Sequence, residues 1–111
     1  MSYRTYYHFN IKENPIEDKF SESDLIDDFR KAYEDAKYAF NEEGIPDQDC
    51  SWYDHEKDVK EFSKKYPDIV FELNGVGEET FDIWNKYFQN GKMQFCPANV
   101  TFDLYDQNKL E

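Results

Sequence analysis

The stretch WYDHEKD, residues 52 to 58, brings an indole, a phenol, an imidazole and three carboxylates into seven positions. His55 lies between Asp54 and Glu56, and Asp58 follows closely, so these side chains could hold a metal ion or form an acid–base pair. The same residues also suit the first turn of a helix, because carboxylates near a helix N-terminus interact favourably with the helix dipole. We favour the helix start.

A metal site would draw on His8, Cys50, His55 and Cys96. Their spacing contains no C-x-x-C, H-x-x-x-H or H-E-x-x-H pattern, and Cys50 with His55 alone is not a zinc signature. The start of the chain lacks the pattern of a signal peptide, so we expect a cytoplasmic protein of a host cell with free thiols. We predict that no metal binds and that His55 and both cysteines are chemically dispensable.

Acid–base chemistry could use Asp54 with His55, or Glu78 with Glu79 in the stretch GVGEE, which we interpret as a turn. An enzyme of this kind also needs a positioned nucleophile or a cofactor site. The sequence contains no Walker loop, G-x-S-x-G motif or dinucleotide-binding fingerprint. We therefore predict a protein that is not an enzyme and binds no cofactor.

The formal net charge of the chain is −12, and nearly all of it belongs to one segment. Residues 13 to 58 hold 16 acidic and 5 basic side chains, whereas the rest of the chain holds 9 acidic and 8 basic ones. This charge disfavours direct binding to nucleic acid or to an anionic membrane, and no apolar run reaches the roughly 20 residues that span a bilayer. It favours a basic protein partner, because an opposite field speeds and orients the encounter.

One long helix should position most of these acids. The segment SESDLIDDFRKAYEDAKYAFNEEG, residues 21 to 44, begins with two candidate caps, Ser21 and Ser23, and ends at Gly44, a typical stop signal. Its acidic side chains should face outward, because apolar residues at steps of three and four form a stripe toward the core. The stripe consists of Leu25, Phe29, Ala32, Ala36 and Ala39 or Phe40.

A second helix should begin near Ser51 or Asp54 and end before Pro67. Its carboxylates lie near the start and its lysines near the end, which is the arrangement that the helix dipole prefers. The residues at helical spacing on its inner side are His55, Val59, Phe62 and Tyr66.

Strands are expected before and after the two helices. Alternating residues predict a strand over residues 3 to 11, and the same period of two returns after Pro67. Asn90 and Gly91 form the strongest short hairpin signal in the chain. The remaining expected elements are a turn in NGVGEE, strands in TFDIWNKYF and KMQFC, and a last strand in NVTFDLY, residues 99 to 105.

These elements predict one α+β domain over residues 1–111. Two helices should pack on one face of a mainly antiparallel sheet of 4–5 strands, in a sandwich related to the ferredoxin-like fold.

Residues 52–94, WYDHEKDVKEFSKKYPDIVFELNGVGEETFDIWNKYFQNGKMQ, resemble a cassette found in small proteins of bacteriophages and mobile elements. Its features are a helix that ends in KKYPD, a strand, a G-x-G-E-E turn and the pattern D-x-W-x-K-Y-F-x-N-G-K. The stretch is also similar to the ferredoxin-like domain of YubB-type plasmid and phage proteins. The resemblance implies a phage context without a catalytic residue, and it does not include the acidic first helix.

We predict a non-enzymatic inhibitor of phage type that binds a basic host defence protein, as anti-CRISPR and antirestriction proteins do. Carboxylates spaced along a helix can occupy the positions that phosphates take along a duplex, so a nucleic-acid-binding protein would accept such a surface. The alternative is a ferredoxin-like structural or self-assembling domain, such as a homodimer, whose charge serves only solubility. The residues predicted to bind the partner are Glu22, Asp24, Asp27, Asp28, Glu34, Asp35, Tyr38, Glu42 and Glu43.

Overall fold

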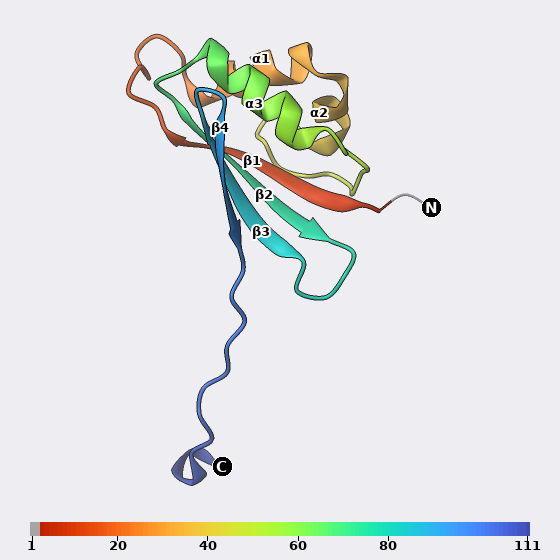
Figure 1. The fold of residues 1–111 in the computed structure, drawn as a ribbon, viewed down its shortest axis with the longest axis vertical. Coiled ribbons are helices and arrows are strands. Elements are labelled where there is room, and N and C mark those ends of the chain that lie inside the picture. Colours follow the sequence, from red (N-terminus) through yellow and green to blue (C-terminus); the bar gives the residue numbers. More distant parts are fainter. Residues whose placement is uncertain (1–2) are drawn as a thin grey trace.

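A layer of helices covers one face of a curved sheet in the computed structural model, which describes residues 3–111 (Figure 1). The predicted α+β class is confirmed, with three α-helices where two were expected. None of these helices is long and apolar enough to cross a bilayer. In chain order the elements are β1 (Thr5–Glu13), α1 (Glu22–Ala32), α2 (Glu34–Ala39), α3 (His55–Lys65), β2 (Val70–Gly77), β3 (Ile83–Gln89), β4 (Lys92–Pro97) and a short 3-10 helix, Gln107–Lys109.

The sheet is an antiparallel meander in the order β1-β2-β3-β4. All three helices lie in the connection between β1 and β2, so the element order differs from the β-α-β-β-α-β order of a ferredoxin-like domain. The predicted hairpin at Asn90 and Gly91 is confirmed: both residues have positive φ, 48° and 80°, and they join Gln89 to Lys92.

Aromatic side chains form the core between the helices and the sheet. The Phe9 ring of β1 stacks on Phe29 at 4.9 Å, on Phe40 at 5.1 Å and on Phe71 at 5.8 Å between ring centroids. All four rings are buried, and so is Trp52, which packs at 5.8 Å from Phe29. The alternation along β1 therefore gave the buried face correctly.

The long helix expected over residues 21 to 44 is interrupted. Tyr33 has an extended backbone, with φ −129° and ψ 118°, and separates α1 from α2. Its ring packs against Phe29 at 5.0 Å, and the change of direction lets Phe40 reach the core beside Phe9. The predicted stripe is wrong at Ala32, which is exposed, because it assumed one continuous helix.

The turn predicted in NGVGEE, residues 74 to 79, begins later than expected, at Glu78. Residues up to Gly77 belong to β2, and the turn to β3 follows over residues 78 to 82. The Trp84 ring lies directly over Gly75, where an added Cβ would stand 2.1 Å from the ring. Gly75 therefore makes room for the Trp84 ring of the neighbouring strand. From the sequence alone, a glycine with this role looks the same as a glycine in a turn.

The predicted last strand at residues 99 to 105 is absent. This segment has no regular structure and continues from the end of β4 away from the body of the molecule (Figure 1). The sheet of the described residues therefore has four strands, the lower of the two expected numbers.

Candidate functional site

The acids of α1 are largely engaged in holding the helix itself. The Ser21 hydroxyl accepts from the Asp24 backbone N–H, and the Asp24 carboxylate accepts from the Ser21 N–H, so the expected cap is a capping box. Asp27 forms an ion pair of 2.8 Å with Lys31 one turn later. Of the acids predicted to bind a partner on this helix, only Glu22 has no such contact within residues 3–111.

Asp28 joins two helices, contrary to the expectation that it faces solvent. Its Oδ2 atom accepts from Tyr66 Oη at 2.6 Å and pairs with Lys65 Nζ at 2.8 Å. Burial by itself raises the pKa of the Asp28 carboxyl, but the hydrogen bonds from Lys65 and Tyr66 outweigh burial and hold that pKa below its ordinary value. Burial, aided by the Asp28 carboxylate, raises the pKa of Tyr66 to about 12. Asp28 is thus a structural acceptor.

The free acids gather on α2 and on the segment that follows it. Glu34 and Asp35 in the first turn of α2, and Glu42 and Glu43 in the turn after it, are exposed and form no ion pair within the described residues. Tyr38 stands among them with 58% of its surface exposed. We call Glu34, Asp35, Glu42 and Glu43 the acidic patch.

The segment from residue 40 to residue 54 carries five acids and no lysine or arginine. Asp47 in this segment is exposed and was not among the predicted residues, because it lies beyond the helix expected over residues 21 to 44. The acidic surface is therefore centred on α2 and the segment after it, with α1 at its margin.

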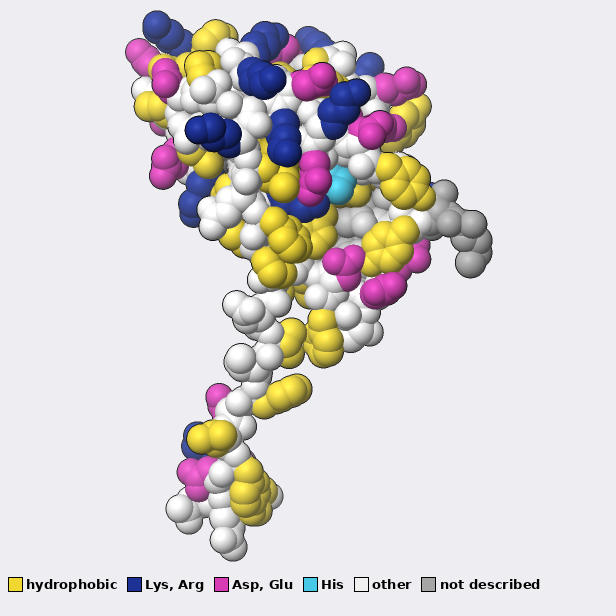
Figure 2. Space-filling model, viewed as in Figure 1, with side chains coloured by type: hydrophobic (Ala, Val, Ile, Leu, Met, Phe, Trp, Pro, Cys, Tyr) yellow, Lys and Arg dark blue, Asp and Glu magenta, His cyan; other side chains and the backbone are white. Residues whose placement is uncertain are grey.

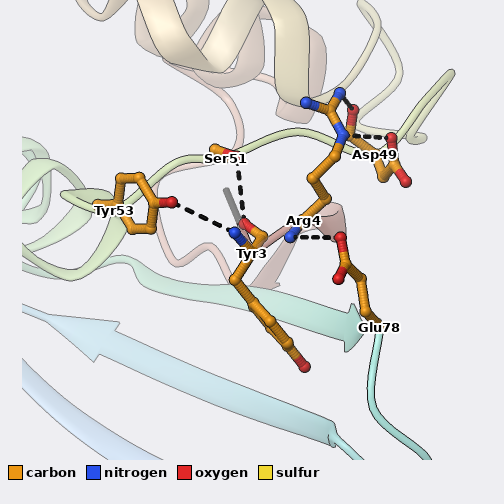
Figure 3. A network of polar contacts seen from close by, with 6 residues as sticks. All are labelled: Tyr3, Arg4, Asp49, Ser51, Tyr53 and Glu78. Carbon is orange, nitrogen blue, oxygen red and sulfur yellow. Dashed lines mark hydrogen bonds and ion pairs between the residues drawn. The ribbon is translucent and has the colours of Figure 1, made fainter. Parts of the chain in front are cut away.

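A polar network holds this segment against the start of β1 (Figure 3). Arg4 Nε pairs with Asp49 Oδ1 at 2.9 Å, and Arg4 Nη2 donates to the Asp49 carbonyl at 2.6 Å. Ser51 Oγ donates to the Tyr3 carbonyl at 3.1 Å, and the Arg4 backbone N–H donates to Glu78 Oε1 at 3.0 Å. The acidic segment is thus fixed to the sheet.

The face of α3 has a different character. Its first turn is acidic, and lysines follow, so that lysine and acidic side chains are interspersed over this side of the molecule (Figure 2). The predicted helix start is confirmed at His55, although the preceding Asp54 makes no side-chain capping bond. The concentrated negative charge therefore belongs to α2 and the segment after it, and not to the whole helical layer.

A second feature brings His55 of α3 next to Lys86 of β3, 31 positions along the chain. His55 Nδ1 donates to the Trp52 carbonyl at 2.9 Å, which leaves Nε2 to accept from Lys86 Nζ at 2.7 Å. Lys86 Nζ also pairs with Glu56 Oε2 at 2.8 Å and lies 4.1 Å from the centroid of the Trp84 ring. Lys86 is only 7% exposed, and its charge is compensated by these contacts.

The electrostatics of this cluster favour a neutral imidazole. Burial, and then the ammonium of Lys86, lower the pKa of His55. The hydrogen bond from Lys86 lowers the pKa of Glu56. The His55 ring also stacks on Trp84, with 5.3 Å between centroids and 16° between planes.

These groups line a small cavity between β1, β3 and the segment before α3. Tyr7, Trp52 and Trp84 form its buried walls, and Tyr3 and Asp82 form part of its rim. Tyr3 Oη donates a hydrogen bond to Asp82 Oδ2. Lys86 Nζ, the amine next to the His55 imidazole, is also held by Glu56 Oε2 and lies against the Trp84 ring, so these contacts describe a packed aromatic and ionic cluster. Sequence reasoning found His55 and missed Lys86, for which the only signal was a lysine on the apolar side of the strand pattern in TFDIWNKYF.

Over residues 3–111, no three His, Cys, Asp or Glu side chains converge in a way that could hold a metal ion. Cys50 is buried, and Cys96 is half-buried in β4; both are free. Burial raises the pKa of the Cys50 thiol, which makes this cysteine a poor nucleophile at neutral pH.

The chain matches no family model, no curated protein and no solved structure.

Proposed function

We propose that this protein is a binding module that uses the acidic patch against a basic protein partner. The observation that carries the proposal is the set of exposed carboxylates on α2 and the following turn, which have no compensating lysine or arginine within 4 Å in the described residues. Exposed acids without partners add little to folding, whereas a basic surface could pair with several of them at once.

The partner class follows from the charge and from the resemblance of residues 52–94 to phage proteins. A basic groove that binds nucleic acid would attract this patch and would then be closed to its own ligand. We propose a phage-type inhibitor of a host defence protein, such as a CRISPR effector or a restriction enzyme. Tyr38, exposed among the acids, would supply an apolar anchor at the centre of the contact.

The test is a matched pair of neutralised variants. The first carries Glu34→Gln, Asp35→Asn, Glu42→Gln and Glu43→Gln. The control carries Glu13→Gln, Glu17→Gln, Asp68→Asn and Glu79→Gln, which are exposed acids outside the patch, so both variants lose the same charge. Each protein is assayed for inhibition of DNA cleavage by a panel of purified CRISPR effector complexes and restriction enzymes.

We expect the wild-type chain to inhibit at least one member of the panel, with affinity that falls as salt rises from about 50 to about 150 mM, because screening shortens the reach of the charges. Neutralising the patch should weaken this inhibition at least about tenfold, and the control variant should lose less than about threefold. Equal losses in both variants would show that net charge matters and the patch does not. Inhibition that is insensitive to salt would refute the electrostatic mechanism.

The alternative, a structural or self-assembling domain, is favoured by a different observation. None of the described residues covers the sheet face opposite the helices. Tyr6, Val76 and Ile83 lie on it side by side with 47%, 38% and 42% of their surfaces exposed. This face does not involve the acidic patch, so the two functions are tested separately.

A further inference from the structure

The two edges of the sheet differ in whether their backbone groups are paired. At the β1 edge, Thr5 exchanges hydrogen bonds of 2.9 and 3.0 Å with Cys50, and the Phe9 N–H donates to the Gly44 carbonyl at 2.8 Å. The segment after α2 therefore closes that edge. At the other end of the sheet, β4 has no strand or loop beside it within the described residues. Such an edge is a template for a further strand.

The direction of the free backbone groups on β4 follows from its pairing with β3. The Ala98 N–H donates to the Ile83 carbonyl at 2.8 Å, so even-numbered residues of β4 point their N–H groups toward β3. Met93 and Phe95 therefore present their N–H and C=O groups outward, and Pro97 presents only its C=O. The edge can accept a strand over residues 93 to 97.

The segment after β4 has the composition of a strand, but it pairs with no strand of the sheet within the described residues. Phe102 is 88% exposed, Leu104 92% and Tyr105 78%, although each is a large apolar side chain. Val100 is 47% exposed. The apolar residues Val100, Phe102 and Leu104 alternate with the polar residues Thr101 and Asp103, which is the period of two of a strand. Figure 2 shows hydrophobic side chains of this segment standing clear of the body. Large apolar side chains left in water are typical of a surface that another chain covers.

The pairing of β4 with β3 shows to which face of the sheet the side chains after β4 would point if the strand continued. Met93, Phe95 and Pro97 lie opposite Phe88, Lys86 and Trp84, on the helix side, so Cys96 and Ala98 lie on the uncovered face. A regular continuation of β4 places Val100, Phe102 and Leu104 on that same uncovered face. Tyr6, Val76 and Ile83 form a cross-strand row there.

We propose that two copies of the chain pair through β4 and residues 99–105, each copy adding its extended segment to the open edge of the other. The pairing is antiparallel and two-fold symmetric, with Asn99 opposite Asn99 at the axis. Each β4 then lies beside the segment of the partner, and the two four-stranded sheets become one continuous sheet.

This register satisfies both charge and polarity. Lys92 of one copy lies opposite Asp106 of the other, an opposite-charge pair across the strands. Val100 lies opposite Ala98 and extends the row of Ile83, Val76 and Tyr6. Registers shifted by two residues in either direction place Lys92 opposite Leu104 or Asn108, so the opposite-charge pair is lost. A shift by one residue would place side chains of opposite faces across from one another.

The pairing removes apolar surface from water. In this register Phe102 lies across the strands from Cys96 of the other copy, and Tyr105 lies across from Met93, so both aromatic side chains lose part of the surface that they now expose. The pairing also gives the outward groups of Met93 and Phe95 their hydrogen-bond partners.

The first test is the molar mass in solution by light scattering, at protein concentrations up to about 200 µM. We expect a dimer of the 13.4 kDa chain. Ending the chain at Ala98 should give a monomer. Phe102→Asp should raise the dissociation constant at least about tenfold, whereas Thr101→Asp, which places the same charge on the other face, should change it less than about threefold.

A cross-link reports the register. In a Cys96→Ser background, Asn99→Cys should form an intermolecular disulfide on mild oxidation, because hydrogen-bonded antiparallel partners lie about 5.5 Å apart between Cα atoms. The matched Gln107→Cys variant should stay reduced, since its two copies would stand far apart on either side of the axis.

Three outcomes would overturn the proposal. These are a wild-type monomer at the highest concentration, a dimer that persists when the chain ends at Ala98, and a monomer whose residues 100–104 are protected from hydrogen exchange because the segment folds back on its own sheet. None of them bears on the acidic patch, which has no residue in this interface.

Discussion

The Tyr66 hydroxyl donates a hydrogen bond of 2.6 Å to Asp28 Oδ2 and so connects the end of α3 to the middle of α1. The two residues are 38 positions apart, and Lys65 joins the same oxygen at 2.8 Å. The helix pattern predicts that Asp28 faces outward, but its partners Tyr66 and Lys65 belong to the protein itself.

We predict that Asp28→Asn lowers the free energy of unfolding by about 1–2 kcal/mol, because it weakens a charge-assisted hydrogen bond in a half-buried place. Urea denaturation followed by circular dichroism measures the loss. Asp27→Asn is the matched control: its pair with Lys31 is exposed, so the change should cost about 0.5 kcal/mol or less. Equal effects of the two substitutions would mean that Asp28 has no special role in joining the helices.

The stability of the fold should depend on the protonation of His55. Because the pKa of His55 is lowered in the folded protein, the unfolded chain binds more protons below about pH 6.5, and stability is lost as pH falls through that value. Above this pH the contribution is fully present. The physical reasons are that burial of the imidazole, and then the ammonium of Lys86, disfavour the protonated form of His55. Nε2 also accepts from Lys86 Nζ and cannot do so once protonated.

Thermal melting of wild type between pH 7.5 and pH 5.5 should therefore show a falling midpoint. The His55→Gln variant keeps an acceptor and does not titrate, so its midpoint should change less over the same range. The carboxyls of Asp28 and Glu56, whose pKa values are lowered, affect stability only at more acidic pH. Parallel curves for the two proteins would contradict the assigned role of His55.

Gly75→Ala should destabilise the protein by about 1–3 kcal/mol, because the new methyl group overlaps the Trp84 ring, which is buried and cannot move freely. The matched change is Gly77→Ala, where the new atom meets the flexible ends of Asp82 and Tyr3 and the cost should be smaller. The comparison requires only the denaturation midpoints of both variants. A larger loss of stability for Gly77→Ala than for Gly75→Ala would contradict the close packing of Trp84 on Gly75.

Gly91→Val should cost about 1–3 kcal/mol, since the backbone at this position has φ of 80° and a β-branched residue is strained there. Gly91→Asn should cost less, because asparagine tolerates positive φ. Both new side chains meet the Lys64 side chain, so the difference between the variants isolates the backbone strain. If valine were as well tolerated as asparagine, the type I′ geometry of the hairpin would be incorrect.

Several elements could be predicted from the sequence because their causes are local. The period of two along β1 gives Tyr7 and Phe9 the same face whatever surrounds them. Ser21 caps α1 with groups three positions away, and Asn90 and Gly91 close a hairpin by their own backbone preferences. The acidic charge of residues 13 to 58 is likewise a property of the sequence alone.

Other features depend on contacts between segments that are distant in the sequence. Tyr33 carries no cap, glycine or proline signal, and its extended backbone makes sense only once Phe29 and Phe40 pack on the sheet. Gly75 looks like a turn residue until Trp84 of the next strand lies over it.

The pairing of His55 with Lys86, and that of Asp28 with Tyr66, likewise required the packed helices and sheet. Residues 99–105 show the same division: their alternation favours a strand, but a strand forms only where an edge is available to pair with it, and that is decided by tertiary or quaternary structure.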